Sequence, residues 1–437
     1  MKKAAFNTVG CKVNQYDTEA IISLFEKAGY EIVNFEEKAD VYVINTCTVT
    51  GLSARKSRQM IRRAKKSNSN SLVVVVGCYA QTAPREVENI PGVNLVIGTK
   101  DRSRIVELVE HIDSCENKIN MVSDIMKTRE FEDLRVETYK ERTRAFIKIQ
   151  EGCNQFCSYC IIPYARGPVR SRRPEDIISE INRLVNLGFK EVVLTGIHVA
   201  SYGKDINRSS LIEIIKEVNE IEGVERIRLS SVEPGTITPE FVRTAAFLKK
   251  LCPHYHLSLQ SGCDKTLERM NRKYSTYQYW EAVEMLRENI DDVALTTDIM
   301  VGFPGETDEE FEQTYSFVEK ISFAKMHVFK YSPRKGTPAA GFPGQVDPLK
   351  KEERSKRLLM LSEKCNLGFN RKYIGRTMPV LFEQEFKSKP GYIEGLTSNY
   401  IKVVCKGDNI LQGRIIDCKL NSVENDYING EIAGMHE

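Results

Sequence analysis

Three observations on the sequence predict an α/β protein with three structural units. Apolar, β-branched runs alternate with helical stretches through residues 1–112 and again through residues 145–374, as in parallel α/β domains. The charged stretch between them, residues 113–144, lacks this periodicity and is interpreted as a linker. Residues 375–437 are short strands with Gly and Asn turns, which predicts a small all-β module.

The first unit is predicted to be a parallel sheet covered by helices. Its strands are AAFNTV, DVYVINT, SLVVVVG and VNLVIG. Cys11, Cys47 and Cys78 each stand just past the end of one of the first three. Because the carboxyl ends of parallel strands share one edge, where ligands usually bind, we expect these cysteines to meet in space. A lone cysteine is commonly a small buried apolar residue, but three in one topological position favour a metal site.

A strongly basic segment, RKSRQMIRRAKKS, follows the second of these strands and is predicted to be helical. Basic clusters are weak evidence by themselves. Two interpretations stay open, a solvated surface helix and a contact with nucleic acid.

The second unit is predicted to be a partial (βα)6 barrel. Its strand candidates are AFIKIQ, EVVLTG, RIRLSS, HYHLSLQ, VALTTDIMVG and KMHVFKYS, with helical stretches between them. Six such units are too few for the closed eightfold barrel. A long charged helix over about 348–373 follows, and then the strands of the β-module: MPVLFEQ, YIEGLT, YIKVVC, ILQGRIIDCKL and YINGEIA.

The composition is that of an ordinary soluble globular protein, with 437 residues, 41% hydrophobic and 28% charged. No apolar run approaches the length of a membrane helix, and the N-terminus has no apolar core of a signal peptide. We therefore expect a cytoplasmic protein without a membrane partner. In a reducing compartment its twelve cysteines are expected to be thiols, metal ligands or catalysts rather than disulfides.

Three further cysteines, Cys153, Cys157 and Cys160, lie within one short loop after the first barrel strand. Their spacing lets the loop wrap a metal–sulfur cube with each thiolate on a different iron, which leaves the fourth iron for a non-protein ligand. A zinc site would require a fourth Cys or His, and the nearest downstream histidine is His198, on another strand end. An iron–sulfur cluster is therefore favoured.

The loop CNQFCSYC resembles the signature of radical S-adenosylmethionine enzymes, with Tyr159 as the aromatic residue before the last cysteine. The segment VGFPGET, Val301–Thr307, is similar to their glycine-rich adenine-side segment. This resemblance implies that the loop cysteines are catalytic and hold a [4Fe-4S] cluster whose open iron binds S-adenosylmethionine. It also implies a 5′-deoxyadenosyl radical.

The order of the three units resembles a narrower group, the methylthiotransferases, over essentially the whole chain. These enzymes join a three-cysteine domain, a radical domain and a β-module called TRAM. The resemblance implies a second [4Fe-4S] cluster on Cys11, Cys47 and Cys78, which carries the sulfur to be inserted. It further implies tRNA, an electron donor such as flavodoxin or ferredoxin, and a sulfur donor as partners.

The branch that the sequence resembles most is the tRNA enzyme for N6-threonylcarbamoyladenosine. Five segments are similar to that branch: TVGCKVNQYDTEAI, LTGIHVASYG, RLSSVEP, HLSLQSGCDKTLERMNRKY and YSPRKGTPAA. The expected reaction is methylthiolation of carbon 2 of this adenosine at position 37, in the anticodon loop. Two branches remain as alternatives, one acting on isopentenyladenosine in tRNA and one on a ribosomal-protein aspartate. A non-enzymatic iron–sulfur protein that binds RNA or senses redox state is the alternative from another class, although the GFPGET segment and the partial barrel favour an enzyme.

Other candidate residues follow from position. Gly302 and Gly305 are expected to let the backbone approach the adenosine of the cofactor. Polar residues at strand ends are candidates for binding its ribose or methionine: Ser231, Glu233, Gln260 and Asp298. Arginines behind the cysteine loop are expected either to meet phosphate or to coat the surface: Arg166, Arg170, Arg172 and Arg173. Tyr331 and Arg334 are expected near the substrate.

The C-terminal module has seven Lys and Arg residues against nine Asp and Glu residues. This net acidic charge leaves its contact with RNA open. Such contact would depend on Lys402, Lys406 and Arg414, or would fall to the basic helix and the segment ARGPVRSRR.

Overall fold

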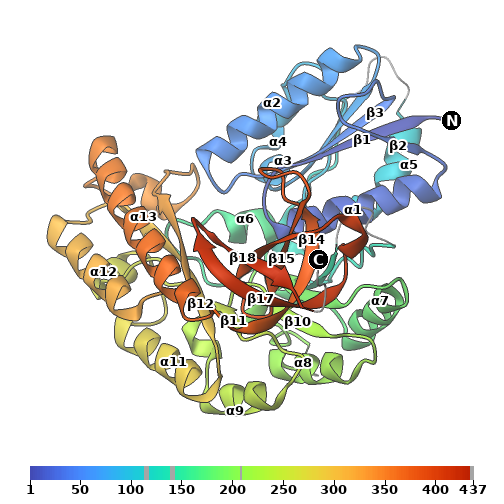
Figure 1. Cartoon of the computed structure of the whole chain (residues 1–437). Coiled ribbons are helices and arrows are strands. Elements are labelled where there is room, and N and C mark those ends of the chain that lie inside the picture. The colour runs from blue at the N-terminus through green and yellow to red at the C-terminus, as the bar shows by residue number, and fades with distance from the viewer. Residues whose placement is uncertain (113–117, 138–142, 207–208, 434–437) are drawn as a thin grey trace.

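A computed structural model describes residues 1–112, 118–137, 143–206 and 209–433 of the chain (Figure 1). Its N-terminal domain is built on a six-stranded sheet in the order β2-β1-β3-β4-β5-β6, and every pair of neighbours is parallel. The strands are β1 Lys3–Thr8, β2 Glu31–Val33, β3 Val41–Thr46, β4 Leu72–Gly77, β5 Leu95–Val96 and β6 Ile119–Asn120. The helices are α1 Lys12–Lys27, α2 Gly51–Ser67, α3 Cys78–Thr82, α4 Pro84–Glu88 and α5 Ile105–Glu110.

Two apolar cores, one on each face, hold this sheet. All six residues of β3 are buried, as expected for a central strand with helices on both faces. The predicted parallel α/β fold of the first unit is confirmed.

The stretch 113–144, predicted as a linker, also contributes to both neighbouring folds. Its β6 pairs in parallel with β5 at the edge of the sheet. Leu134 and Val136 are buried in the core of the next domain. Residues 113–117 and 138–142 lie outside the described residues.

The second domain is a partial barrel of six parallel strands. They are β7 Arg144–Glu151, β9 Glu191–Gly196, β10 Arg226–Leu229, β11 His254–His256, β12 Ala294–Val301 and β13 Lys325–Lys330. Two sheets, β10-β9-β7-β8 and β11-β12-β13, are connected by isolated bridges such as Val232–Leu257. The short β8, Arg170–Ser171, runs antiparallel to β7.

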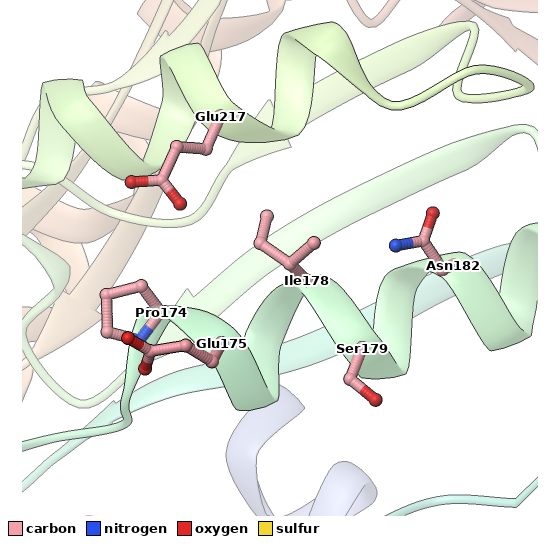
Figure 2. A pocket seen from close by; sticks show the side chains of 6 residues that line it. All are labelled: Pro174, Glu175, Ile178, Ser179, Asn182 and Glu217. Atoms are coloured by element: carbon pink, nitrogen blue, oxygen red, sulfur yellow. The ribbon is translucent and has the colours of Figure 1, made fainter.

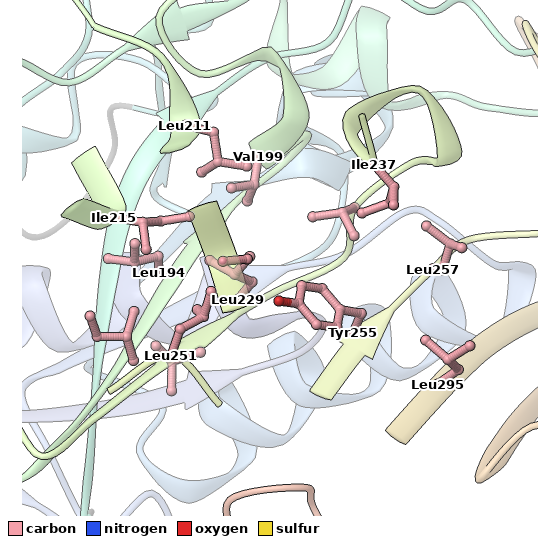
Figure 3. Packing of buried hydrophobic residues seen from close by; sticks show 14 of the residues in the cluster. Leu194, Val199, Leu211, Ile215, Leu229, Ile237, Leu251, Tyr255, Leu257 and Leu295 are labelled. Carbon is pink, nitrogen blue, oxygen red and sulfur yellow. The ribbon is translucent and has the colours of Figure 1, made fainter. Parts of the chain in front are cut away.

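Helices pack around the outside of this partial barrel. They are α7 Pro174–Asn186, α8 Leu211–Glu220, α9 Pro239–Phe247, α10 Asp264–Arg269, α11 Thr276–Asn289, α12 Asp308–Ile321 and α13 Pro348–Arg371. The short α6, Ile162–Arg166, lies instead against α3 of the N-terminal domain. Figure 3 shows the packing, in which Leu194 of β9 and Leu229 of β10 meet Ile215 of α8. The six-unit barrel is thus confirmed.

The C-terminal module is a closed five-stranded barrel in the order β14-β15-β16-β18-β17. Its strands are β14 Thr377–Glu385, β15 Tyr392–Thr397, β16 Lys402–Lys406, β17 Ile415–Glu424 and β18 Tyr427–Ile432. It is fastened to the partial barrel by buried arginines. Arg226 donates to the carbonyl oxygens of Leu396 and Pro379 at 2.9 and 2.7 Å, and Arg228 donates to that of Ser398 at 2.9 Å.

Within the described part of the chain, every helix is too short or too polar to cross a membrane.

Candidate active site

The first cysteine triad lies at one edge of the N-terminal sheet. Cys11, Cys47 and Cys78 follow β1, β3 and β4, which are adjacent in the sheet. A Cβ built on Gly10 would lie 3.3 Å from the sulfur of Cys47, so the first two turns are in contact. Burial raises the pKa of the Cys78 thiol to about 12; the Arg166 guanidinium opposes this rise, and the Cys47 and Cys11 thiols add to it. The structure thus brings the three thiols together, two of them buried and Cys11 exposed.

Backbone geometry and one amide side chain hold these turns in place. Gly77 has φ of +96°, and a Cβ there would lie 2.4 Å from Asn45 Oδ1; only glycine allows this approach. Asn14 donates to the carbonyl oxygens of Val9 and Thr46 at 2.8 and 3.1 Å. The turns that carry Cys11 and Cys47 are therefore linked through one buried amide.

The second triad lies on the loop after β7, at the carboxyl end of the partial barrel. The backbone N–H of Cys153 donates to Gly167 O at 3.0 Å, and that of Cys160 to Cys157 O at 2.9 Å. Burial raises the pKa of Cys153 to about 11 and that of Cys160 to about 12, and the Cys157 thiol adds to both. The three thiols therefore also lie close together.

The segment after α10 holds this loop from the opposite side. The backbone N–H of Ser158 donates to Met270 O at 3.0 Å, and Asn271 Nδ2 donates to Phe156 O at 2.9 Å. Arg272 Nη1 lies 3.3 Å from the sulfur of Cys157. This loop is thus supported by backbone, amide and guanidinium contacts.

The donors of each triad fit an iron–sulfur cluster. Each set offers three thiols, and a cluster takes one thiolate on each of three irons. Among the described residues, no three Cys, His, Asp or Glu side chains are arranged to hold one metal ion. The three thiols of each triad therefore fit a cluster that takes three protein ligands.

Glu233 is the predicted cofactor-side residue that lies nearest the cysteine loop. Its carboxylate accepts a hydrogen bond from Gln155 Nε2 at 3.3 Å. It forms an ion pair with Arg272 Nη2 at 2.8 Å and lies 3.0 Å from His198 Nε2. Burial raises the pKa of its carboxyl group, but His198 and Arg272 outweigh burial and lower it overall. Glu233 is thus an ionised group held beside Cys157.

The other three strand-end residues occupy different places. Gln260, at φ +69°, donates its backbone N–H to Asp298 O at 2.8 Å, so these two residues adjoin. The Asp298 carboxylate lies 3.3 Å from His256 Nε2. Ser231 is exposed at the end of β10.

The glycine-rich turn packs on the cysteine loop through aromatic rings. Phe303 is buried and contacts Tyr159 edge-on, with ring centroids 6.4 Å apart. Gly302 and Gly305 both have positive φ, but a Cβ on Gly302 would lie 2.3 Å from Lys351 Cγ. That face of Gly302 therefore packs against α13, whereas a Cβ on Gly305 would lie 3.6 Å from Arg269 Nε, at ordinary contact distance.

The prediction for the arginines behind the loop is wrong for three of the four. Arg166, Arg170 and Arg172 are at most 2% exposed, so they neither coat the surface nor lie open to phosphate. Arg172 forms ion pairs with Asp133, at 2.7 Å, and with Glu180. These pairs offset the cost of burying its charge. Only Arg173 is exposed.

The loop after β13 reaches across to the first triad. Arg334 Nη2 donates to Thr48 Oγ1 at 3.0 Å, directly beside Cys47. Ser332 Oγ accepts from the backbone N–H of Gly51 at 3.4 Å. Tyr331 is buried and its ring packs on Phe303 at 5.4 Å. Farther along, the backbone N–H of Ala339 donates to Ser158 O of the cysteine loop at 2.9 Å. The segment after β13 thus contacts both cysteine sites.

Sequence reasoning gave Arg166 the wrong role and missed Arg272 and Asp17, because their contacts come from segments distant in the chain. Arg272 had a signal, because it lies in the segment MNRKY that resembles the threonylcarbamoyl branch. Asp17 had none.

Two cavities lie apart from the cysteines. Figure 2 shows one of about 620 Å³ on the outer surface, lined by Glu175 and Ile178 of α7 and by Glu217 of α8. Another, of about 260 Å³, lies where the C-terminal barrel meets the partial barrel and includes Arg144, Thr296 and Tyr400. Neither has a cysteine in its lining.

Comparison with protein families matches residues 147–318 to the radical SAM superfamily and residues 3–98 to the uncharacterized protein family UPF0004. The threonylcarbamoyladenosine tRNA methylthiotransferase MtaB of Bacillus subtilis is 44% identical over 100% of this chain and 98% of its own. The enzyme of that name from Aquifex aeolicus is 40% identical over 93% of this chain and 97% of its own. A tRNA-2-methylthio-N(6)-dimethylallyladenosine synthase of Moorella thermoacetica is 38% identical over 97% of each.

Among solved structures, the radical S-adenosylmethionine methyltransferase TsrM from Kitasatospora setae matches with a TM-score of 0.56 at 16% identity, over 78% of this chain and 77% of its own. That likeness concerns the fold alone. Full-length identity to the MtaB enzymes, together with the two domain matches, shows that the chain belongs to the radical S-adenosylmethionine methylthiotransferases, a family of transferases.

Proposed function

We propose that the chain methylthiolates carbon 2 of N6-threonylcarbamoyladenosine at position 37 of tRNA, with two [4Fe-4S] clusters and S-adenosylmethionine. The observation that carries this proposal is the 44% identity, over the whole chain, to an enzyme named for that substrate. The two cysteine triads support the two-cluster part. They lie at the carboxyl ends of two sheets, and the segment after β13 contacts both sites.

The reaction breaks the C2–H bond of the adenine and forms a C2–S bond. That C–H bond is inert to acid–base catalysis, and the clusters with S-adenosylmethionine supply the one-electron chemistry that it requires. The hydrogen leaves as part of 5′-deoxyadenosine, and the methyl group comes from a second S-adenosylmethionine. The sulfur comes from a sulfur donor, and a reductant such as flavodoxin or ferredoxin supplies the electrons.

The chain's own residues have separate roles in this proposal. Cys153, Cys157 and Cys160 would hold the catalytic cluster, with Glu233 beside them to orient the cosubstrate. Gln260, Asp298 and the turn at Gly305 would complete its binding site. Cys11, Cys47 and Cys78 would hold the second cluster.

The tRNA would approach the side on which both triads lie. Anticodon-loop bases are unpaired and are commonly recognised by stacking on aromatic rings. Phe156 lies within the catalytic loop and Tyr164 lies in α6 just after it. Each is 39% exposed, and the two rings pair edge-to-face with centroids 5.9 Å apart. They offer ring faces to such bases, in the cytoplasm where tRNA is modified.

The test is mass spectrometry of nucleosides from total tRNA of a strain that lacks the gene, with and without complementation. The 2-methylthio derivative of threonylcarbamoyladenosine should disappear on deletion and return with the wild-type chain. It should stay absent with Cys157→Ala or Cys47→Ala. Cys365→Ala removes a buried thiol of α13 outside both triads and should restore it.

A second substrate has a specific observation in its favour, the 38% identity to a dimethylallyladenosine enzyme. If the threonylcarbamoyl nucleoside persists on deletion while 2-methylthio-dimethylallyladenosine is lost, the substrate is the latter. If no tRNA nucleoside changes, the proposal of a tRNA substrate fails.

A further inference from the structure

Arg166 connects the catalytic loop to the other cysteine triad. It is the last residue of α6, six positions after Cys160, and it is fully buried. Its Nε lies 3.1 Å from the sulfur of Cys78. Its Nη2 contacts Asn14 Oδ1, the amide that links the turns of Cys11 and Cys47. A residue of the radical domain thus contributes to the surroundings of the N-terminal triad.

Arg166 also belongs to a buried charge network that spans the two domains. Its Nη1 lies 3.0 Å from a carboxylate oxygen of Asp17 and 3.0 Å from one of Glu151. Lys148 reaches the other oxygen of Asp17 at 2.5 Å, and Arg102 binds Asp17 as well. All five side chains are at most 3% exposed. Asp17 and Arg102 come from the N-terminal domain, and the other three from the radical domain.

The network carries more positive than negative charge. Three cations face two carboxylates in the buried set. Glu132 adds a third carboxylate, 2.9 Å from Arg102. Arg170 adds a fourth cation, which donates to the carbonyl oxygens of Arg166 and Pro168 at 3.0 and 2.9 Å. Four cations against three carboxylates leave one positive charge, and a buried charge without compensation is costly.

The nearest group that can supply the missing negative charge is the sulfur of Cys78. As a free thiol it is neutral, but as a thiolate on an iron–sulfur cluster it is anionic. Hydrogen bonds and positive charge at a cluster thiolate favour the reduced, more negative state of the cluster. The guanidinium is therefore placed to affect the electronic properties of that cluster as well as to join the domains.

We propose that Arg166 is a positioning residue for the N-terminal cluster, which holds Cys78 against the radical domain and raises the reduction potential of that cluster. The inference rests on the assignment of Cys78 as a cluster ligand in the proposed function. Arg272 has the corresponding contact at the other triad, 3.3 Å from the sulfur of Cys157 and at most 7% exposed. Each triad therefore has a buried arginine in contact with the sulfur of one of its cysteines. Substitution of either arginine serves as the matched control for substitution of the other.

The experiment measures the potential of one cluster at a time in the full-length chain. Replacing Cys153, Cys157 and Cys160 by Ala leaves only the N-terminal cluster, and its midpoint potential is measured by an anaerobic titration followed by EPR. Arg166→Gln should shift that potential to a more negative value. Arg166→Lys, which keeps the charge but has no Nε–H beside the sulfur, should give a smaller shift in the same direction. Arg272→Gln should give none.

The reverse background completes the control. With Cys11, Cys47 and Cys78 replaced by Ala, Arg272→Gln should shift the remaining cluster, and Arg166→Gln should leave it unchanged. Iron content and the melting temperature are measured for every variant.

An unchanged potential in an Arg166 variant that folds and keeps its iron would overturn the inference and reduce Arg166 to an ion-pair partner. If Arg166→Gln does not fold, the midpoint potential of Arg166→Lys is compared with that of the wild type instead, because this variant preserves the net charge of the network. A shift to a more negative potential would support the inference, and an unchanged potential would overturn it. If the wild-type chain binds only one cluster, the two-cluster part of the proposed function fails. If it binds both and Arg166 has no effect, only this inference fails.

Discussion

At the scale of single residues, backbone conformation decides where the thiols of the catalytic loop stand. Gly152 precedes Cys153 and has φ of +75°, and a Cβ at this position would lie 1.9 Å from Pro168 O. Residues other than glycine are strained at this φ. Pro168 O is a backbone atom and cannot rotate away as a flexible side chain could. The loop conformation therefore depends on this glycine.

A matched pair of substitutions separates strain from clash. Gly188 also has positive φ, +94°, but nothing lies within 4 Å of its Cβ position. We expect Gly188→Ala to lower the free energy of unfolding by about 1 kcal/mol, from backbone strain alone. Gly152→Ala should cost about 3 kcal/mol or more and should lose the iron of the catalytic cluster. Chemical unfolding and iron analysis measure both effects, and equal losses in the two variants would contradict this reading of the loop.

The cysteines were predictable from the sequence at this scale, and the arginines were not. Cys47 and Cys78 follow apolar runs that end at the same edge of a parallel sheet, and this topology is local information. The burial of Arg166 depends on Asp17, 149 positions earlier, and no spacing rule reports such a pairing. The same holds for Arg272 and Glu233.

At the scale of secondary-structure elements, α2 shows how a very basic helix packs on a protein core. Its buried residues are small or aliphatic and recur at helical spacing: Ala54, Ser57, Ile61 and Ala64. The basic residues fall on the other faces. Arg58 pairs with Glu86 at 3.5 Å and Arg63 with Glu36. Arg55, Lys56 and Arg62 are exposed, and within the described chain no ion pair holds them.

We expect these three free cations to contact tRNA phosphates. Changing Arg55, Lys56 and Arg62 together to Glu should weaken tRNA binding at least about tenfold at low salt. It should also reduce the slope of log K against log salt by about two to three, since each lost phosphate contact contributes about 0.7–0.9. Binding is measured by filter retention or fluorescence over a range of salt concentrations.

The control is a triple charge reversal at the opposite end of the molecule. Lys216 of α8 and Arg243 and Lys249, in and just after α9, are exposed. Figure 1 shows α8 and α9 at the opposite end of the molecule from α2. Reversal of these three charges should leave affinity and salt slope near the wild-type values. Equal weakening by both triples would show that only net charge matters and that α2 is a solvated surface helix.

The elements that sequence reasoning missed are the shortest ones. β2 has three residues and β6 has two, which is too few for an alternating pattern to be read. Their strand conformation comes from pairing with β1 and β5, and so from tertiary structure. By contrast, β12 and α13 have 8 and 24 residues and were readable from periodicity.

At the scale of the whole molecule, the C-terminal barrel is joined to the partial barrel through a polar, buried interface. Arg228 pairs with Glu191 at 2.7 Å and reaches the carbonyl oxygen of Ser398. Tyr400 of the barrel stacks on His254 of β11, with ring centroids 4.4 Å apart. The sequence predicted both modules but not the interface between them. The residues that form it, from Glu191 to Tyr400, are separated by about 200 positions, and no local pattern connects them.

This interface should make stability depend on pH. Burial lowers the pKa of His254 well below its usual value, and the positive charges of Arg228 and His256 act in the same direction. The folded chain therefore keeps the ring neutral, whereas the unfolded chain protonates it near pH 6.5. Below that pH the unfolded state binds the extra proton, so the stability contributed by this group falls as pH decreases.

The size of this pH effect on the free energy of unfolding follows from the binding of one proton. Between pH 6.5 and 5.5, the free energy of unfolding should fall by about 1 kcal/mol because of His254. His254→Phe keeps an aromatic ring against Tyr400 but cannot titrate, and other groups titrate equally in both proteins. Urea unfolding of the two proteins at pH 7.5, 6.5 and 5.5 therefore isolates the contribution of His254. As pH falls, the stability of His254→Phe relative to the wild type should rise by about 1 kcal/mol. A difference that stays constant would mean that His254 is protonated in the folded state. The interface would then tolerate its charge.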